Sequence, residues 1–354
     1  MPRRKVKKRK RKPLAKRKRW ANWPDERLLQ LRFKDLKLSM RGTWLADCLR
    51  ELNRVLAEHG IPVRPHAWLS TEWFSPEHTP GIAIPFYLAH PRLMRLEHKM
   101  IIDVEGGTHA ECMRILRHET GHVMQHSYAL QRDPRWRRLF GRSSTRYPSY
   151  YRPNPASKRY VQHLPLWYAQ SHPDEDFAET FAVWLRPRFD WRKRYAGWPA
   201  LKKLEYVDEL MTELKNERPV LTHRVRVDPL SSLTHTLAQH YDKKKERYLL
   251  DTPTTYDRDL QRIFSDEPRH RQVRAASTFL RENRGKIRRM VSRWTGEYQL
   301  ILDSVLDEMI DRCREMKLRA VGTDRQLRMD FTVLLTAKTV HSLYSPSRRQ
   351  WIAV

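Results

Sequence analysis

The chain has 354 residues and is longer than a single domain of ordinary size. Hydrophobic residues make up 40% of it and include twelve tryptophans, which is enough to form a buried core. No run approaches the roughly 20 apolar residues of a membrane-spanning helix, which excludes a transmembrane segment. The formal net charge of +29 would suit a polyanion-binding protein, but its distribution along the chain is uneven.

The chain begins with a polybasic segment. Thirteen of the seventy Lys and Arg residues lie between Arg3 and Arg19, with no acidic residue among them. Such a segment repels itself and buries nothing, so residues 1–22 are predicted to be a disordered tail. Residues 3–19 could bind nucleic acid or another polyanion without sequence preference.

The three cysteines indicate a reducing compartment. Cys48, Cys112 and Cys313 are far apart, and each falls in an apolar helical pattern, which is typical of buried free thiols and not of a zinc-finger array. No apolar run of signal-peptide length follows the basic tail. We therefore expect a soluble, cytoplasmic protein.

Two elements are predicted before residue 100. Apolar residues from Trp44 to Leu56 recur at helical spacing, and Gly60 with Pro62 ends this amphipathic helix. The segment 81–88 is rich in β-forming residues but contains Pro85, which cannot donate to a central ladder. We interpret it as an edge strand.

The predicted helix from Thr108 to Tyr128 carries the pattern H-E-x-x-H as His118, Glu119 and His122. Histidines four residues apart lie on one helix face, so both imidazoles can reach one ion. Zinc lowers the pKa of a bound water to about 7, and an adjacent carboxylate can take its proton. We predict one zinc ion, with Glu119 as general base.

A catalytic zinc needs a third protein ligand. The histidine that metzincins place six residues after the second one is excluded, because Tyr128 stands there. His126 is rejected, because three ligands along one straight helix span about 12 Å of rise and cannot converge on one ion.

The remaining candidates lie in a helix predicted to start near Pro173, with Ser171 offering an N-cap hydroxyl. Glu175 and Glu179 are four residues apart on one face of this helix. One of them can bind the metal while the other orients a ligand, and we expect Glu179 to accept the second N–H of His118 or His122.

The rest of the chain separates into a loop and a helical region. Residues 140–165 show no hydrophobic periodicity and are predicted to form a long loop. Aromatic and basic side chains alternate from Arg146 to Arg152, as they do in proteins that bind single-stranded nucleic acids. After residue 217 the composition becomes helical and strongly charged. We expect a metallopeptidase domain over 23–217 and a helical domain over 218–354.

At these residues the sequence resembles the gluzincin metallopeptidases, in which H-E-x-x-H is followed by a helix with a glutamate ligand and a second acid four residues later. The stretch from Tyr168 to Ala182, with its E-D-F-A-E core, is similar to a family of bacterial zinc-binding metallopeptidases and distantly similar to the catalytic domain of anthrax lethal factor. The likeness covers roughly 108–185.

The resemblance implies Glu175 as the third zinc ligand. It also implies that Tyr168, seven residues earlier, stabilises the oxyanion, as the matching tyrosine of lethal factor is thought to do. The fold class expected is α+β, a mostly helical zincin-like domain with a small sheet, followed by an all-α domain. Zincins commonly pair an extended peptide with an edge strand, for which 81–88 is the candidate, although a plain core strand fits equally.

The predicted function is a zinc-dependent peptidase that hydrolyses peptide bonds of a protein or peptide substrate by attack of a zinc-bound water. Two alternatives stay open. The basic tail and the aromatic loop are compatible with a protease that acts on nucleic-acid-associated protein. They are also compatible with a DNA- or RNA-binding protein whose zinc site is structural or inactive.

Overall fold

The computed structural model describes residues 18–148, 150–151, 153–154, 156–248, 256–344 and 352–353. Its α-helices in chain order are α1 (Asp25–Leu29), α2 (Trp44–Glu58), α3 (Pro91–Ile101), α4 (His109–Tyr128), α5 (Pro134–Phe140), α6 (Pro173–Trp184), α7 (Trp191–Arg194), α8 (Leu201–Glu213), α9 (Leu237–Tyr248), α10 (Asp257–Ile263), α11 (Ala276–Thr295), α12 (Gln299–Glu315) and α13 (Asp324–Tyr344). The strands are β1 (His66–Ser70), β2 (Gly81–Pro85), β3 (Tyr150–Tyr151) and β4 (Ile352–Ala353). Short 3-10 helices are η1 (Arg19–Asn22), η2 (Phe33–Leu36), η3 (Phe86–Ala89), η4 (Leu130–Arg132), η5 (Pro165–Gln170) and η6 (Pro268–His270).

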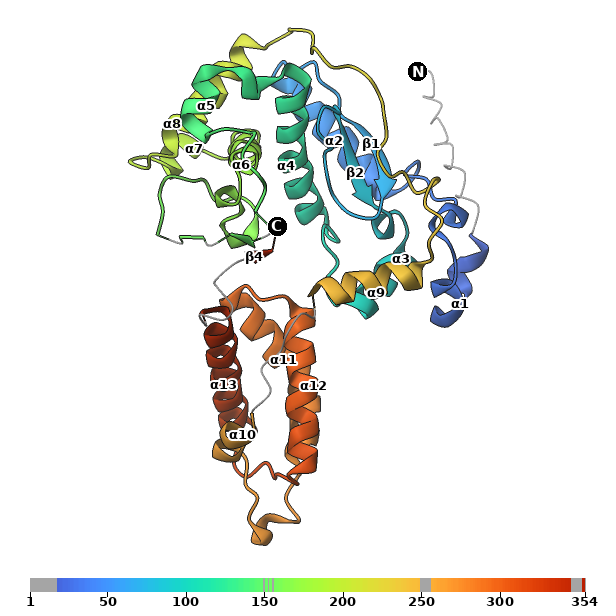
Figure 1. The fold of residues 1–354 in the computed structure, drawn as a ribbon, viewed down its shortest axis with the longest axis vertical. Helices are drawn as coiled ribbons and strands as arrows, with labels where there is room; N and C mark the ends of the chain where they lie inside the picture. The colour runs from blue at the N-terminus through green and yellow to red at the C-terminus, as the bar shows by residue number, and fades with distance from the viewer. Residues whose placement is uncertain are drawn as a thin grey trace, which may run out of the picture.

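The ribbon has an upper part around α4 and a lower bundle of α10 to α13 (Figure 1), and each part has its own hydrophobic core. The upper one surrounds α4 and extends from Trp20 to Tyr241, and the lower one, inside the bundle of α10 to α13, extends from Tyr256 to Leu335. The first core therefore continues past residue 217 as far as α9, and the second begins at Tyr256. The reason is that Leu230, Leu237 and Tyr241, in a stretch that looks charged overall, pack on the first core.

The predicted tail is shorter than 22 residues. Residues 1–17 lie outside the described part of the chain, so that part of the prediction is untested. Trp20, however, is buried in η1, and its indole N–H donates to the Leu36 carbonyl at 3.1 Å. A large aromatic ring anchors this end of the segment in spite of the surrounding charge.

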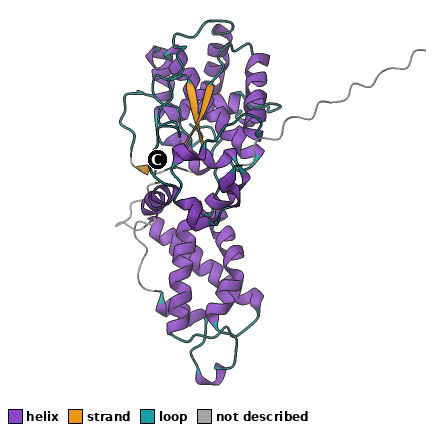
Figure 2. Cartoon of the chain, turned by 90° about the vertical axis from the view of Figure 1, so that its right-hand side faces the viewer, coloured by secondary structure: helices purple, strands orange, loops and turns teal. Residues whose placement is uncertain are grey.

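The first core contains a small parallel sheet, visible in Figure 2 within the upper half of the molecule. β1 pairs with β2 in the register His66↔Gly81 to Ser70↔Pro85, and all five residues of β2 are buried. The far side of β2 is met by Phe74, whose carbonyl accepts from the Ala83 N–H at 2.8 Å. β2 thus behaves as a core strand that ends at Pro85, and its role as a free edge for a peptide is not supported.

Helices α4 and α6 pack side by side through a glycine. A Cβ built on Gly121 would lie 2.6 Å from the Ala178 Cα, a distance that real Cβ atoms do not show. The helix α4 starts at a capping box, in which Thr108 and Glu111 satisfy each other's backbone N–H groups. The pair of helices forms the frame of the candidate site.

The lower bundle is fixed by charged pairs as well as by apolar packing. Arg284 of α11 donates to Asp307 of α12 through both terminal nitrogens, at 2.6 and 2.8 Å, and its Nε donates to Asp303. The bundle meets the upper part where Gln299 Nε2 donates to Asp103 at 2.8 Å. From α9 to α13 this region is helical, and β4 after it pairs antiparallel with β3.

Two further expectations are met by the described residues. Cys48, Cys112 and Cys313 are buried free thiols. No helix in the described part of the chain is both long and apolar enough to cross a membrane. The mostly helical content with one small parallel sheet is consistent with the α+β class.

Candidate metal centre

Two imidazoles project from one face of α4, because His118 and His122 are one helical turn apart. Both side chains are buried, with 3% and 8% of the residue exposed. Their rings meet edge to face at a centroid distance of 4.9 Å. The predicted helix therefore presents both histidines toward the neighbouring α6.

The first turn of α6 presents the third group, the carboxylate of Glu175. This helix begins after His172, whose Nδ1 accepts from the Asp174 N–H at 3.2 Å, and Pro173 is its first residue. The predicted N-cap residue, Ser171, instead donates its hydroxyl to the Tyr168 carbonyl. An imidazole can replace the hydroxyl as a cap because its unprotonated nitrogen is also an acceptor.

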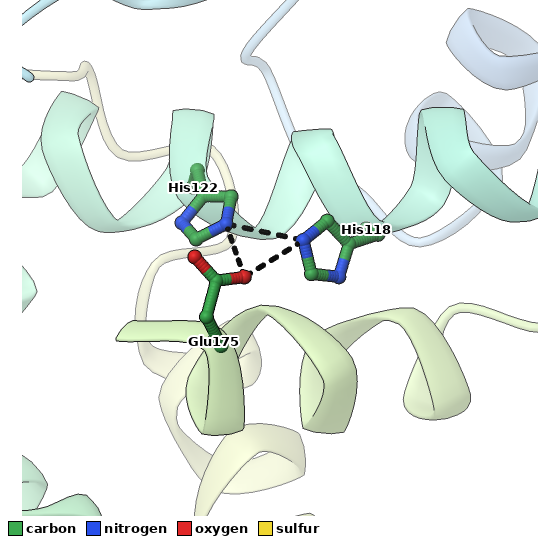
Figure 3. Close-up of side chains that lie close together, drawn as sticks. All are labelled: His118, His122 and Glu175. Atoms are coloured by element: carbon green, nitrogen blue, oxygen red, sulfur yellow. Dashed lines mark hydrogen bonds and ion pairs between the residues drawn. The ribbon is translucent and has the colours of Figure 1, made fainter. Parts of the chain in front are cut away.

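The three side chains converge on one point (Figure 3). Glu175 Oε2 lies 3.0 Å from His118 Nε2 and 3.1 Å from His122 Nε2, and the two nitrogens are 3.2 Å apart. A tetrahedral zinc with bonds of about 2.0–2.1 Å separates its ligand atoms by roughly 3.3 Å. The buried group His118, His122 and Glu175 could therefore hold a metal ion with little rearrangement.

Glu179 lies one turn after Glu175 and contacts the outer nitrogen of His118. Its Oε1 is 2.8 Å from His118 Nδ1, and its Oε2 accepts from the Leu164 N–H at 2.7 Å. Because a carboxylate only accepts, Nδ1 carries the proton in a neutral ring and the lone pair of Nε2 faces the convergence point.

The charges around the convergence point favour a cation. Burial lowers the pKa of His118, but hydrogen bonds to Glu175 and Glu179 and their charges outweigh burial and raise it well above the usual value. Burial raises the pKa of Glu175, but the charge of His122 and the hydrogen bonds from both histidines hold it well below its usual range. The two buried carboxylates thus favour a positive charge between the histidines.

Glu119, the predicted general base, is 6% exposed, and its charge acts on His122 and Tyr168. Its Oε2 is buried and has no hydrogen-bond partner among the described residues. Its backbone carbonyl accepts from the Ser75 hydroxyl at 3.2 Å. An orphaned buried carboxylate oxygen needs a partner, and a water or a substrate group would supply it.

Tyr168 lies beside His118, with a ring centroid distance of 5.7 Å. It follows Leu166 and Trp167, whose positive φ angles of 61° and 54° turn the chain sharply within η5. Burial, together with the charges of Glu175 and Glu119, raises the pKa of Tyr168 above its usual value. Its hydroxyl therefore stays protonated and can act as a donor.

One side chain at the site was not predicted. The Tyr147 hydroxyl donates to Glu175 Oε1 at 3.0 Å, on the side of the carboxylate opposite the histidines. The only available signal was the composition of the loop 140–165, which we interpreted as a nucleic-acid motif. Tyr147 of that motif contacts Glu175. The Tyr151 ring lies 6.3 Å from that of Tyr168, and its hydroxyl donates to the Leu166 carbonyl.

His126 is close to the group but does not join it. Its ring stands 6.2 Å from that of His78, and its Nδ1 is buried without a partner among the described residues. Burial, with smaller effects of His122 and His78, lowers the pKa of His126 to about 4. It is a neutral histidine beside the centre, as expected from the limited reach of three ligands on one helix.

The comparisons with known proteins agree with this geometry over part of the chain. No curated protein and no solved structure matches the sequence, so the likeness to lethal factor stays a resemblance. A family model described as "Putative zinc-binding metallo-peptidase" matches residues 112–190, a segment that contains both histidines, Glu119, Tyr168, Glu175 and Glu179. Over these residues the chain is similar to that family of zinc-binding metallopeptidases.

Proposed function

We propose that the protein is a zinc-dependent peptidase that hydrolyses peptide bonds of a protein or peptide substrate. The convergence of His118, His122 and Glu175, whose ligand atoms lie 3.0–3.2 Å apart, carries this proposal. Three protein ligands are the number that catalytic zinc takes, because the fourth position is kept for water or substrate. The family similarity over residues 112–190 supports the same activity.

The surrounding side chains fit the steps of hydrolysis. His118, His122 and Glu175 would hold the zinc, which would supply a Lewis acid to polarise a substrate carbonyl and to lower the pKa of a water to about 7. Glu119 takes the proton of the attacking water and passes it to the leaving amine. Tyr168 donates its hydroxyl to the oxygen on which negative charge develops, and Glu179 keeps the His118 ring oriented.

The decisive experiment measures zinc and cleavage together. We expect about one zinc per chain by elemental analysis, cleavage of members of a diverse peptide library detected by mass spectrometry, and loss of cleavage after chelation with recovery on adding zinc. If the zinc-loaded protein cleaves no peptide or protein substrate, the peptidase proposal is contradicted and the metal site is structural.

A further inference from the structure

A short strap, residues 143–147, crosses the start of α6 beside the candidate metal centre. The Ser143 hydroxyl donates to the Asp174 carboxylate at 3.0 Å. Two residues later, the Thr145 carbonyl accepts from His172 Nε2 at 2.7 Å. These two contacts hold the strap along the start of α6. Its last residue, Tyr147, therefore reaches the carboxylate of Glu175, which follows Asp174 in α6.

The last residue of the strap, Tyr147, divides the two oxygens of Glu175 between different partners. Oε2 faces both histidines, whereas Oε1 accepts the Tyr147 hydroxyl at 3.0 Å. We propose that Tyr147 is a positioning residue that keeps Oε1 engaged, so that Glu175 binds the metal through one oxygen and the fourth ligand position stays free for water. This inference rests on the proposed zinc site.

The Tyr147 ring is held independently of its hydroxyl. It stacks on His172 with centroids 3.7 Å apart and planes 16° from parallel. His172 is itself fixed at both nitrogens, by Thr145 and by the N-cap contact to α6. A phenol is protonated at neutral pH, so the hydroxyl donates and the carboxylate oxygen accepts.

Among the described residues, the hydroxyl of Tyr147 is the hydrogen-bond partner of Oε1. A carboxylate can bind a cation through one oxygen or through both. With both oxygens bound beside the water, the second oxygen would add a fifth ligand. The hydroxyl of Tyr147 therefore controls the number of protein atoms on the metal, a role that simple packing does not have.

The test uses cobalt(II) in place of zinc, since four-coordinate cobalt absorbs visible light much more strongly than five-coordinate cobalt. The full-length wild type should show the strong four-coordinate bands. Tyr147→Phe keeps the stacked ring and removes only the hydroxyl, and we expect it to lose those bands and to bind zinc about 10-fold to 100-fold more weakly in a chelator competition. Tyr206→Phe is the matched control, because the Tyr206 hydroxyl donates to the Asp133 carboxylate at 3.0 Å, away from the metal ligands.

Unchanged cobalt bands in Tyr147→Phe overturn the positioning role, even if the zinc affinity falls, because a general loosening would also weaken affinity. Five-coordinate cobalt in the wild type overturns it without any variant. A wild type that binds neither cobalt nor zinc contradicts the proposed function as well, whereas a zinc-bound, active wild type with an unaffected Tyr147→Phe spectrum removes only this inference.

Discussion

The Glu179 carboxylate lies 2.8 Å from Nδ1 of His118, on the side of the imidazole that faces away from the convergence point. It thus fixes which nitrogen of His118 carries the proton. The same carboxylate also holds the Leu164 N–H, which leads into the turn that carries Tyr168. One side chain therefore aligns a proposed metal ligand and the segment that carries the predicted oxyanion donor.

Replacing Glu179 with Gln should weaken zinc binding by about 10-fold to 100-fold. The amide is a poorer acceptor for the Nδ1 proton, so the Nε2 of His118 becomes a weaker ligand. Chelator competition measures the affinity. Glu205→Gln, at an exposed position of α8, is the matched control and should not change it. Wild-type affinity in the Glu179 variant would mean that the ring is oriented by other contacts.

Glu119→Gln should retain zinc and lose about 10²-fold to 10⁴-fold of the cleavage rate, because the amide keeps the shape of the side chain but cannot take a proton. Zinc content by elemental analysis and cleavage rate on one library peptide are measured on the same preparation. Cleavage within a few-fold of the wild type would assign the base to a different group.

Gly121→Ala should separate α4 from α6 and reduce zinc binding. The new Cβ would meet backbone atoms of Ala178, at 2.6 Å for the Cα and 3.0 Å for the carbonyl oxygen, and backbone cannot rotate away. We expect a loss of about 1–3 kcal/mol in the free energy of unfolding. Denaturant unfolding of the metal-free protein and a zinc titration measure the two effects.

Gly285→Ala is the control for the helix glycine itself. Its Cβ would meet only the flexible end of Arg289 at 3.3 Å, within α11. Alanine favours the helix by about 0.5–1 kcal/mol over glycine, so this variant should be slightly more stable and bind zinc normally. If Gly121→Ala and Gly285→Ala changed the free energy of unfolding and zinc binding equally, close packing of α4 on α6 would not explain the effect of Gly121→Ala.

His126 should make the protein sensitive to acid. Burial lowers its folded-state pKa to about 4, below the value of about 6.5 in an unfolded chain. The folded state therefore binds fewer protons, and the stability contributed above pH 6.5 is lost as the pH falls toward 4, by about 3 kcal/mol at most.

His126→Asn removes this titration and should flatten the fall in stability between pH 6.5 and 4. The measurement is the free energy of unfolding in urea at several pH values, with chelator present so that loss of metal does not contribute. Parallel pH curves for the variant and the wild type would show that His126 is not responsible for the acid sensitivity.

Sequence reasoning was successful where the geometry is local. The spacing of His118 and His122 determines their common face, and the acidic first turn of α6 placed Glu175 and Glu179 one turn apart. The observed bounds of α4, His109–Tyr128, also agree with the predicted helix from Thr108 to Tyr128. These features depend on helix geometry and on little else.

Features that depend on distant contacts were missed. Tyr147 meets Glu175 across 28 residues of chain, and the composition of its loop gave no indication of which residue it would contact. The need for glycine at position 121 arises from Ala178, 57 positions later in the sequence. The cap of α6 was assigned to Ser171 because hydroxyl caps are common, whereas the turn around Tyr168 presents His172 instead.

The placement of the ligands on two helices links the metal to folding. An unfolded chain still has His118 and His122 four residues apart, but it brings no carboxylate to them, because Glu175 arrives only when α6 packs on α4. The metal should then prefer the folded state, and each tenfold excess of free zinc over its dissociation constant adds about 1.4 kcal/mol to the free energy of unfolding. The concentration of free zinc would thus affect the stability of the folded protein as well as its proposed activity.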